Sequence, residues 1–344
     1  RPEVGINKVF VIDLKARAVT SEISVPGGPN WIRVLPDGQL AYLSTTSAQK
    51  VVVIDVSSDA VVGELSLDVL GPGNMPGHKT DLRNIVFHPN GKRAYVVAWD
   101  ADAILVADIN ANRVVKAIHL AVTDMWGRLI AMTPDGKRVY AGREPWANPP
   151  WDEGQKFRLF VIDTETNSVV SDIAFDHRVL YSHVGPDGLL YVVGGSKVTV
   201  IDTLTGRVTR DISIPFQGDL SCIALIPNLS KAYVTGLMHT DVVVIAPESG
   251  AILKRIDIGL GGARIVTTPD GSVAYVSRSN NSVDKGGLVI IDTTSDKVIG
   301  RIDTQPEEYG AGYLAPLVIT PDGKYLWWQF SQPKFKIIEV VISS

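Results

Sequence analysis

The chain has 344 residues, of which 45% are hydrophobic and 20% are charged, and its formal net charge is −4. This composition can bury a large core, so a disordered chain is excluded. The slightly acidic balance argues against nucleic acid or an anionic membrane as a partner, because both are bound by basic surfaces. Every apolar stretch is broken within about eight residues, well short of the roughly 20 that span a bilayer as a helix. We expect a globular protein with no nucleic-acid partner and no membrane span.

The number of cysteines and the identity of the first residue give information on where in or outside the cell the protein is located. Cys222 is the only cysteine, so an internal disulfide is excluded. It lies in the apolar run 220–225, which favours a buried small residue over a nucleophile. The first residue is Arg1 rather than methionine, as in a processed precursor or a trimmed chain. This favours a periplasmic or secreted location over the cytoplasm.

One segment returns with variations along the whole chain. Its form is an apolar strand, a Pro-Asp-Gly turn, a strand rich in Tyr and Val, a loop, and a strand that ends in Ile-Asp. The seven turns begin at Pro36, Pro89, Pro134, Pro186, Pro227, Pro269 and Pro321. The strand ends fall at Asp13, Asp55, Asp108, Asp163, Asp202, Ala246 (where the acid is lost), Asp292 and Glu339, at gaps of 39 to 55 residues. Repeats of about 40 to 50 residues with four short strands each are typical of β-propeller blades.

These repeats predict an all-β fold, a single seven-bladed β-propeller domain over residues 1–344. Apolar positions alternate at period two in segments such as 50–55, which excludes a helical solenoid. We expect N-terminal strands to complete the C-terminal blade, with residues 18–23 as its outermost strand, because closure removes exposed sheet edges. The strand beside it is either 8–13 or 335–342. An eighth blade in a longer precursor is the alternative.

Four copies of the Tyr-Val strand, at residues 94–97, 190–193, 232–235 and 274–277, carry a family resemblance. The chain resembles the YVTN-type β-propeller repeat family over essentially its whole length. The resemblance implies the propeller fold. It implies no particular activity, because the family includes surface-layer proteins, periplasmic proteins and relatives of dehydrogenase subunits.

The two faces of the predicted propeller differ in their loops. The turns on one face are short, whereas the loops on the other are long and carry tryptophans, among them Trp126 and Trp146. Long loops rich in tryptophan favour a binding surface over disorder. They could line a small-molecule site, hold a protein or glycan partner, or merely cover the channel.

Arginines begin three inner strands, at Arg83, Arg128 and Arg264. Three guanidiniums at one channel mouth require balancing charge, so we predict a small anionic ligand in a central funnel. The full predicted substrate-binding set is Arg83, Arg128, Arg264, His78, Trp126, Trp146, Asp219 and Glu308. The alternative is that acids of the same loops pair with the arginines, namely Asp81, Asp124, Glu144, Asp219, Glu307 and Glu308.

His183, His239 and Tyr181 are the candidate catalytic residues. A histidine beside a tyrosine and an arginine could move a proton on a bound carboxylate, as in a lyase, an isomerase or a hydrolase. No histidine pair has zinc spacing and no cofactor motif is found, so neither a metal nor a cofactor is expected. One alternative is a lactonase-like hydrolase with a divalent metal, its ligands drawn from Asn30, Asn84, Asp219 and Glu308. Another is an electron-transfer or dehydrogenase subunit whose partner carries the cofactor.

Overall fold

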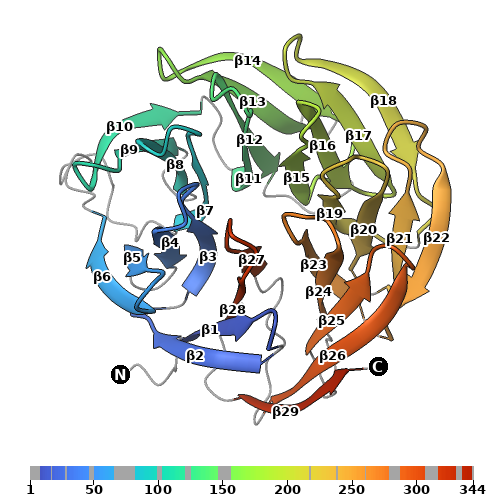
Figure 1. The fold of residues 1–344 in the computed structure, drawn as a ribbon. Helices are drawn as coiled ribbons and strands as arrows, with labels where there is room; N and C mark the ends of the chain where they lie inside the picture. Colours follow the sequence, from blue (N-terminus) through green and yellow to red (C-terminus); the bar gives the residue numbers. More distant parts are fainter. Residues whose placement is uncertain are drawn as a thin grey trace.

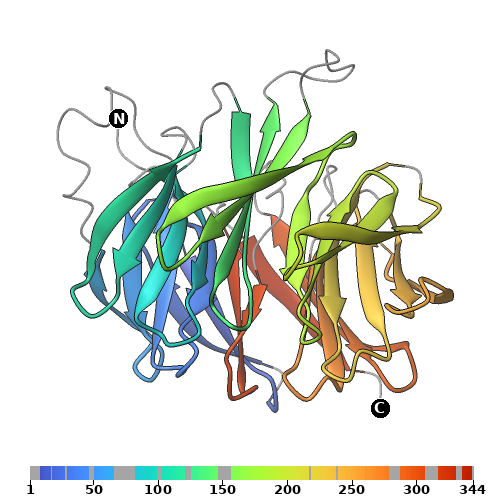
Figure 2. The same cartoon turned by 90° about the horizontal axis from the view of Figure 1, so that it is seen from above.

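The computed structural model contains seven antiparallel sheets arranged around a central axis (Figures 1 and 2). It describes residues 8–16, 18–27, 29–45, 50–65, 82–98, 103–120, 125–145, 156–216, 218–237, 239–259, 261–278, 287–306, 317–330 and 335–342. For residues 125–128, 143–145, 303–306, 329–330 and 335–342 it describes the backbone alone. These residues contain strands and turns, and no helix occurs among them. The prediction of an all-β, seven-bladed propeller is confirmed.

The blades follow one another along the chain, and each runs from the axis outward as strands A, B, C and D (Figure 1). Blade 1 comprises β3 (Pro29–Val34), β4 (Leu40–Thr45), β5 (Val51–Asp55) and β6 (Ala60–Glu64). Blade 2 comprises β7 (Leu82–Phe87), β8 (Arg93–Ala98), β9 (Ala103–Asp108) and β10 (Arg113–His119). Blade 3 comprises β11 (Met125–Met132), β12 (Arg138–Pro145), β13 (Phe157–Asp163) and β14 (Ser168–Phe175).

The remaining blades show the same order with a variation at the chain ends. Blade 4 comprises β15 (Tyr181–Val184), β16 (Leu189–Gly194), β17 (Lys197–Asp202) and β18 (Arg207–Ser213). Blade 5 comprises β19 (Leu220–Leu225), β20 (Ala232–Gly236), β21 (Asp241–Ile245) and β22 (Ile252–Asp257). Blade 6 comprises β23 (Gly262–Thr267), β24 (Val273–Arg278), β25 (Gly287–Asp292), β26 (Lys297–Pro306) and β29 (Phe335–Ile342). Blade 7 comprises β27 (Leu317–Ile319), β28 (Tyr325–Phe330), β1 (Lys8–Asp13) and β2 (Ala18–Ser24).

The repeated Pro-Asp-Gly turn closes the hairpin between strands A and B in every blade. The residue two after the proline donates its amide to the carbonyl three positions earlier, as from Gly38 to Leu35 at 2.9 Å. The middle Asp or Asn accepts the amide two residues on, as Asp37 does from Gln39 at 3.0 Å. Six copies place glycine at the third position with φ between 69° and 75°. Leu229 takes its place in blade 5 with a φ of 57°, a conformation that a residue with a Cβ adopts only at a cost.

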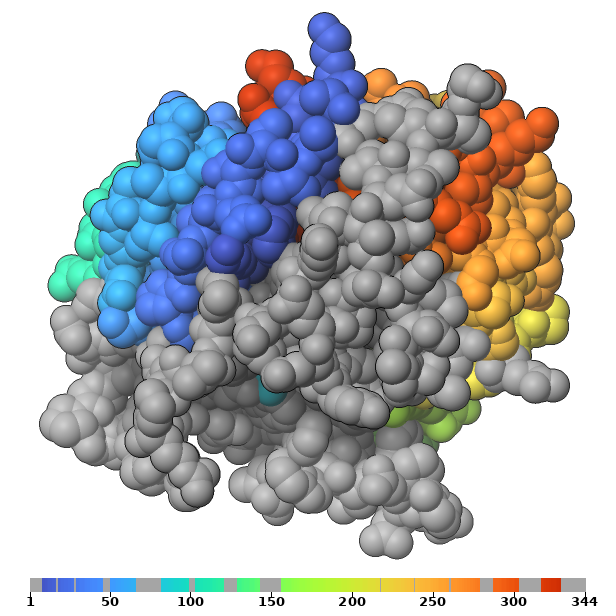
Figure 3. Space-filling view, turned by 90° about the horizontal axis from the view of Figure 1, so that it is seen from below, coloured from blue at the N-terminus to red at the C-terminus, as the bar shows by residue number. Residues whose placement is uncertain are grey.

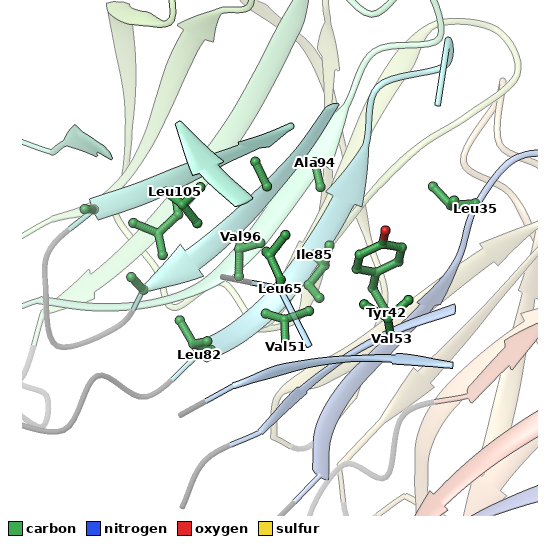
Figure 4. Close-up of a cluster of buried hydrophobic side chains, with 14 residues drawn as sticks. Leu35, Tyr42, Val51, Val53, Leu65, Leu82, Ile85, Ala94, Val96 and Leu105 are labelled. Carbon is green, nitrogen blue, oxygen red and sulfur yellow. The ribbon is translucent and has the colours of Figure 1, made fainter. Parts of the chain in front are cut away.

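Neighbouring blades pack face to face through apolar side chains. The core divides into seven hydrophobic clusters, one at each interface between blades. Figure 4 shows the cluster between blades 1 and 2, where Val51 and Val53 meet Ile85 and Leu105. Each fully buried Val, Leu or Ile contributes about 1.5–3 kcal/mol. Both faces of each sheet are therefore largely buried over strands B and C, which is why these strands are almost continuously apolar, whereas the outermost strands such as β6 and β22 are mostly exposed.

The ring closes through the N-terminal strands, as predicted. β1 pairs with β28 along its length, from Lys8 opposite Phe330 to Asp13 opposite Tyr325. β2 pairs with β1 and forms the outermost strand of blade 7. In Figure 3 the blue N-terminal strands lie between the light-blue strands of blade 1 and the orange to red C-terminal strands. The choice left open by the sequence is thereby resolved in favour of residues 8–13.

The other candidate segment has a different place. β29 pairs with β26 at the outer edge of blade 6, with Gly300 opposite Ile342 and Pro306 opposite Phe335. Blade 6 consequently has five strands. Glu339 lies within this added strand, opposite Asp303, and not at a strand C end like the other repeated acids.

In several blades the tyrosine of the repeated Tyr-Val strand joins one blade to the next. The Tyr95 hydroxyl donates to Asn167 Oδ1 of blade 3 at 2.8 Å. The Tyr233 hydroxyl donates to Asp296 Oδ1 of blade 6 at 2.6 Å, and Lys231 Nζ lies 2.7 Å from the same carboxylate. Burial raises the pKa of both tyrosines, and in Tyr233 the bond to Asp296 adds to this effect. Tyr95 and Tyr233 thus fill the core and fix the angle to the next blade, whereas the Tyr191 hydroxyl donates to Asp187 of its own blade.

Replacement of Tyr233 by phenylalanine should lower the free energy of unfolding by about 1–2 kcal/mol, because Asp296 loses a buried donor. Urea unfolding followed by circular dichroism measures this change. Tyr42→Phe is the matched control, since the Tyr42 hydroxyl has no hydrogen bond among the described residues and its loss should change stability little. Equal effects of the two variants would contradict the role assigned to the Tyr233 bond.

Candidate functional site

The inner strands bring side chains from blades that are far apart in sequence to one axis. Their register is counted back from the proline of each turn. Five residues before it stand Trp31, Asn84, Leu129, Tyr181, Cys222 and Arg264. Three residues before it stand Arg33, Val86, Ala131, His183, Ala224, Val266 and Val318. Because strand side chains alternate in direction, positions five and three share one side of each inner strand.

In three blades a β-bulge precedes the residue that stands five positions before the turn proline. The pairing of strands A and B shifts register between Pro29 and Trp31, between Leu220 and Cys222, and between Gly262 and Arg264. In each case the shift comes immediately before the residue five positions ahead of the turn proline. A bulge bends the strand and changes the direction of the next side chain. The same irregularity in three blades therefore aims Trp31, Cys222 and Arg264 at a common region.

Arg264 and Tyr181 meet across the axis, since they belong to blades 6 and 4. The Arg264 guanidinium carbon lies 5.0 Å from the centroid of the Tyr181 ring and 4.6 Å from that of the Trp31 ring. Arg33 lies 5.2 Å from the same Trp31 ring and is a close electrostatic neighbour of the Tyr181 hydroxyl. Cys222 is 1% exposed and is also an electrostatic neighbour of Tyr181. We call Trp31, Arg33, Tyr181, His183, Cys222 and Arg264 the axial cluster.

The axial cluster holds two cations and no carboxylate. Arg264 is 5% exposed, and neither it nor Arg33 forms an ion pair with an acid of the described chain. Arg33 donates to the carbonyl of Ile32 at 3.1 Å, which is a neutral partner. Burial lowers the pKa of Arg33, and the neighbouring Arg264 charge lowers it further. The two guanidiniums therefore repel each other in a largely water-free setting.

Several buried donors in the cluster have no acceptor. Arg264 Nε and NH1 and Trp31 Nε1 are buried without a hydrogen-bond partner among the described residues. A buried donor without an acceptor costs about 1–3 kcal/mol, and more when it is charged. Native structures seldom tolerate three such atoms together unless a ligand or water satisfies them.

The two titratable neighbours are held in their neutral forms. Burial lowers the pKa of His183 to about 4, and the Arg33 charge contributes to this shift. Burial, with Cys222 adding, raises the pKa of Tyr181 to about 12. At neutral pH His183 is uncharged and a weak base, and Tyr181 keeps its proton. In this state the pair suits hydrogen bonding to a ligand better than proton abstraction.

His239 and Asp219 lie on the outer part of the loop face. The His239 ring packs edge-on against Phe216 at 4.1 Å, and Phe216 in turn carries the Arg255 guanidinium of the outermost strand β22. Asp219 Oδ2 lies 3.7 Å from Arg178 NH1. The structure thus joins the predicted residues Tyr181, His183 and Arg264, and it places His239 and Asp219 with a different group of residues.

The other predicted site residues divide into two groups. Arg83 lies on β7 six residues before its turn proline, one position out of register with Arg264. Arg128 and Trp126 lie on β11, where the structure describes the backbone alone, so residues 125–128 form a strand and not the predicted loop. His78, Trp146 and Glu308 fall outside the described residues.

Sequence reasoning missed Arg33 and Trp31 as site residues. It looked for arginines at the starts of strands, whereas the geometry depends on the distance to the turn that follows. Aligning the seven segments on their turn prolines puts Trp31, Tyr181 and Arg264 in one column and Arg33 with His183 in another. The expectation that Cys222 is buried is confirmed.

The lactonase-like alternative requires metal ligands that converge from several blades. Among the described residues no group of three or more His, Cys, Asp or Glu side chains could hold a metal ion. Two of the proposed lactonase ligands make backbone contacts: the Asn30 amide donates to the Leu82 carbonyl at 3.0 Å, and Asn84 Oδ1 accepts from the Ile85 amide at 2.9 Å. No helix in the described part of the chain is long and apolar enough to cross a membrane.

Comparison with known proteins supports the fold and no particular function. No family model matches the chain, and no curated protein matches it in sequence. Among solved structures it is similar to a chain of hydrazine synthase from Kuenenia stuttgartiensis, with a TM-score of 0.70 and 19% identity over 84% of this chain and 90% of that chain. At this identity the likeness shows the propeller fold alone. The resemblance to the YVTN-type repeat family accordingly rests on the sequence motif.

The low pKa of His183 has a measurable consequence for stability. The unfolded histidine takes up its proton near pH 6.5, whereas the folded one does so near pH 4. Protons therefore favour the unfolded chain as pH falls, and stability should be complete above about pH 6.5 and decline toward pH 4, by about 3 kcal/mol from this residue.

NMR titration of the His183 ring tests this directly. Its resonance should not move between pH 8 and pH 5.5, and the His183→Gln variant should lose stability less steeply than the parent between pH 6.5 and pH 4. A resonance that titrates near pH 6.5 would show that Arg33 and burial do not act on this ring.

Proposed function

We propose that this propeller binds a small anion on its axis, between Arg33 and Arg264. The observation that carries the proposal is a pair of guanidiniums stacked on one Trp31 ring, one of them 5% exposed, with no carboxylate partner in the described chain. A bound anion would remove both the repulsion and the unsatisfied donors.

The free-energy cost of the two buried arginines exceeds what the Trp31 ring returns, which favours a ligand over a purely structural cluster. Each guanidinium carbon lies within about 5 Å of one ring centroid, so the two are less than about 10 Å apart and repel by about 2 kcal/mol at an effective dielectric constant of about 20. A cation–π contact returns about 0.5–2 kcal/mol, which offsets the repulsion but not the cost of desolvating Arg264. A protein that retains such a cost commonly does so at a functional site.

The architecture also suits this role. In propellers and other closed folds, rigid strands position the side chains and the loops of one face control access. Here every member of the axial cluster lies on an inner strand, so its backbone is fixed by the blades on both sides. Whether binding is followed by catalysis depends on Tyr181 and His183, which are neutral donors beside the anion.

Thermal unfolding in chloride-free buffer with and without sulfate, phosphate or small carboxylates tests the proposal. An anion at about 100 times its Kd should stabilise the parent chain by about 2.7 kcal/mol, raising Tm by several degrees. Arg264→Met should abolish this response. Arg255→Met is the matched control, since it removes one arginine that is already paired with Asp241 at 2.7 Å on the outer rim.

The same variant separates a ligand site from a structural ion pair. If Arg264 is an uncompensated charge, Arg264→Met should leave Tm unchanged or raise it in anion-free buffer. If instead an acidic loop residue such as Glu307 or Glu308 neutralises it, the variant should lower Tm and no anion should stabilise the parent. That second pattern would overturn the proposal. Should Arg264→Met fail to fold, Arg33→Met provides the same comparison.

A further inference from the structure

The chemistry of the axial cluster also indicates which anions it suits, an inference that rests on the proposed function. The side chains around the two guanidiniums offer protons and few acceptors. Arg264 Nε, Arg264 NH1 and Trp31 Nε1 are buried donors without a partner among the described residues. Both residues are more than nine-tenths buried, at 5% and 8% exposure.

The cluster offers few acceptor positions to a ligand. Arg33 and Cys222 both lie close enough to Tyr181 to act on its hydroxyl electrostatically. Tyr181 also keeps its proton far above neutral pH, so it contributes no negative charge. Apart from the Tyr181 hydroxyl oxygen and one nitrogen of the neutral His183 ring, a ligand with several N–H or O–H donors would find no side-chain acceptor in the cluster, and unpaired donors are costly when buried. The matching ligand presents mainly acceptor oxygens.

The charge of the cluster sets the charge of the ligand. Two guanidiniums lie on the same indole ring, and their described hydrogen-bond partners are neutral groups such as the Ile32 carbonyl. His183 adds no charge at neutral pH. A singly charged ligand would leave one buried positive charge without compensation, whereas a doubly charged one would balance both.

The apolar residues next to the axial cluster along the axis favour a compact ligand. The residues three positions before the turn include Ala131, Ala224, Val86 and Val266 beside Arg33 and His183. These apolar side chains supply no further polar partner for a long ligand. All polar groups of the axial cluster thus act within one short section of the axis.

We infer that the axial site selects a compact, doubly charged oxyanion, of the tetrahedral sulfate or phosphate type or a short dicarboxylate, over singly charged anions. Both classes present several acceptor oxygens and two charges over a few ångströms. The two arginines would each hold one charge, with the Trp31 indole N–H as a third donor.

Isothermal titration calorimetry of the whole chain at pH 7.5 and constant ionic strength tests the inference with sulfate, phosphate, malonate, succinate and acetate. We expect at least one dianion to bind more than tenfold tighter than acetate. Arg33→Met should reduce this preference to about twofold or less, because one charge then suffices. The order of sulfate, phosphate and the two dicarboxylates separates the tetrahedral class from the dicarboxylate class.

Trp31→Phe tests the indole donor, because it keeps an aromatic ring beneath the arginines and removes only the N–H. It should weaken dianion binding several-fold. Trp327→Phe is the matched control: Trp327 Nε1 is equally buried and unpartnered in the described chain, but the residue lies on β28 in the cluster between blades 7 and 1. Its loss should leave affinity unchanged.

The outcomes separate this inference from the proposal beneath it. Equal affinity for acetate and every dianion would overturn the selectivity and leave anion binding intact. Absence of binding by all five anions, together with a lower Tm for Arg264→Met, would overturn both. Tight binding of dianions that Arg33→Met does not alter would show that the second charge is held elsewhere.

Discussion

Face-to-face packing of apolar sheets around a closed ring is the constraint on which the rest of this protein depends. Each sheet is apolar on both faces, so no blade can bury its surface unless it has a neighbour on either side. The seven interblade clusters satisfy this condition only because the N-terminal strands β1 and β2 complete blade 7. Closure fixes the diameter of the ring and hence the distance between inner strands. The axial cluster exists because that diameter lets Tyr181 reach Arg264.

The ring separates stability from function in space. The face of the tight turns is fixed by Asp and Asn side chains that accept turn amides and by tyrosines that bond to the next blade. The turn contacts recur in every blade and the tyrosine bonds recur in several, because the blades share one geometry. The axial residues do not recur: the position of Arg264 is occupied by Leu129, Cys222 or Asn84 in other blades. A repeat protein that departs from its repeat at the axis has a local requirement there, and buried positive charge is the most expensive departure seen.

Aromatic rings make that departure tolerable. The Trp31 ring lies close to both arginines, which lowers the cost of holding like charges together without supplying a counter-charge. The neutral states of His183 and Tyr181 follow from the same positive field and burial. A bound anion would change both the repulsion between the arginines and the pKa values of His183 and Tyr181. Anion affinity, histidine protonation and thermal stability are therefore expected to be linked.

The sequence alone was sufficient for the repeat, the seven blades, the turn chemistry and the N-terminal closure, because these depend on local patterns of Pro-Asp-Gly, Tyr-Val and Ile-Asp that recur along the chain. It also predicted an anion site with Arg264, Tyr181 and His183 among its residues, and the structure brings these three side chains together. Only the tertiary structure decided that residues 8–13, and not 335–342, occupy blade 7, since both segments have strand patterns and their choice depends on packing at the seam. Only the tertiary structure also shows that Arg33 and Arg264 lie at the same Trp31 ring. The reason is that β-bulges shift the register of the inner strands by one residue. In addition, no local sequence pattern records that blades 1, 4 and 6 meet at the axis.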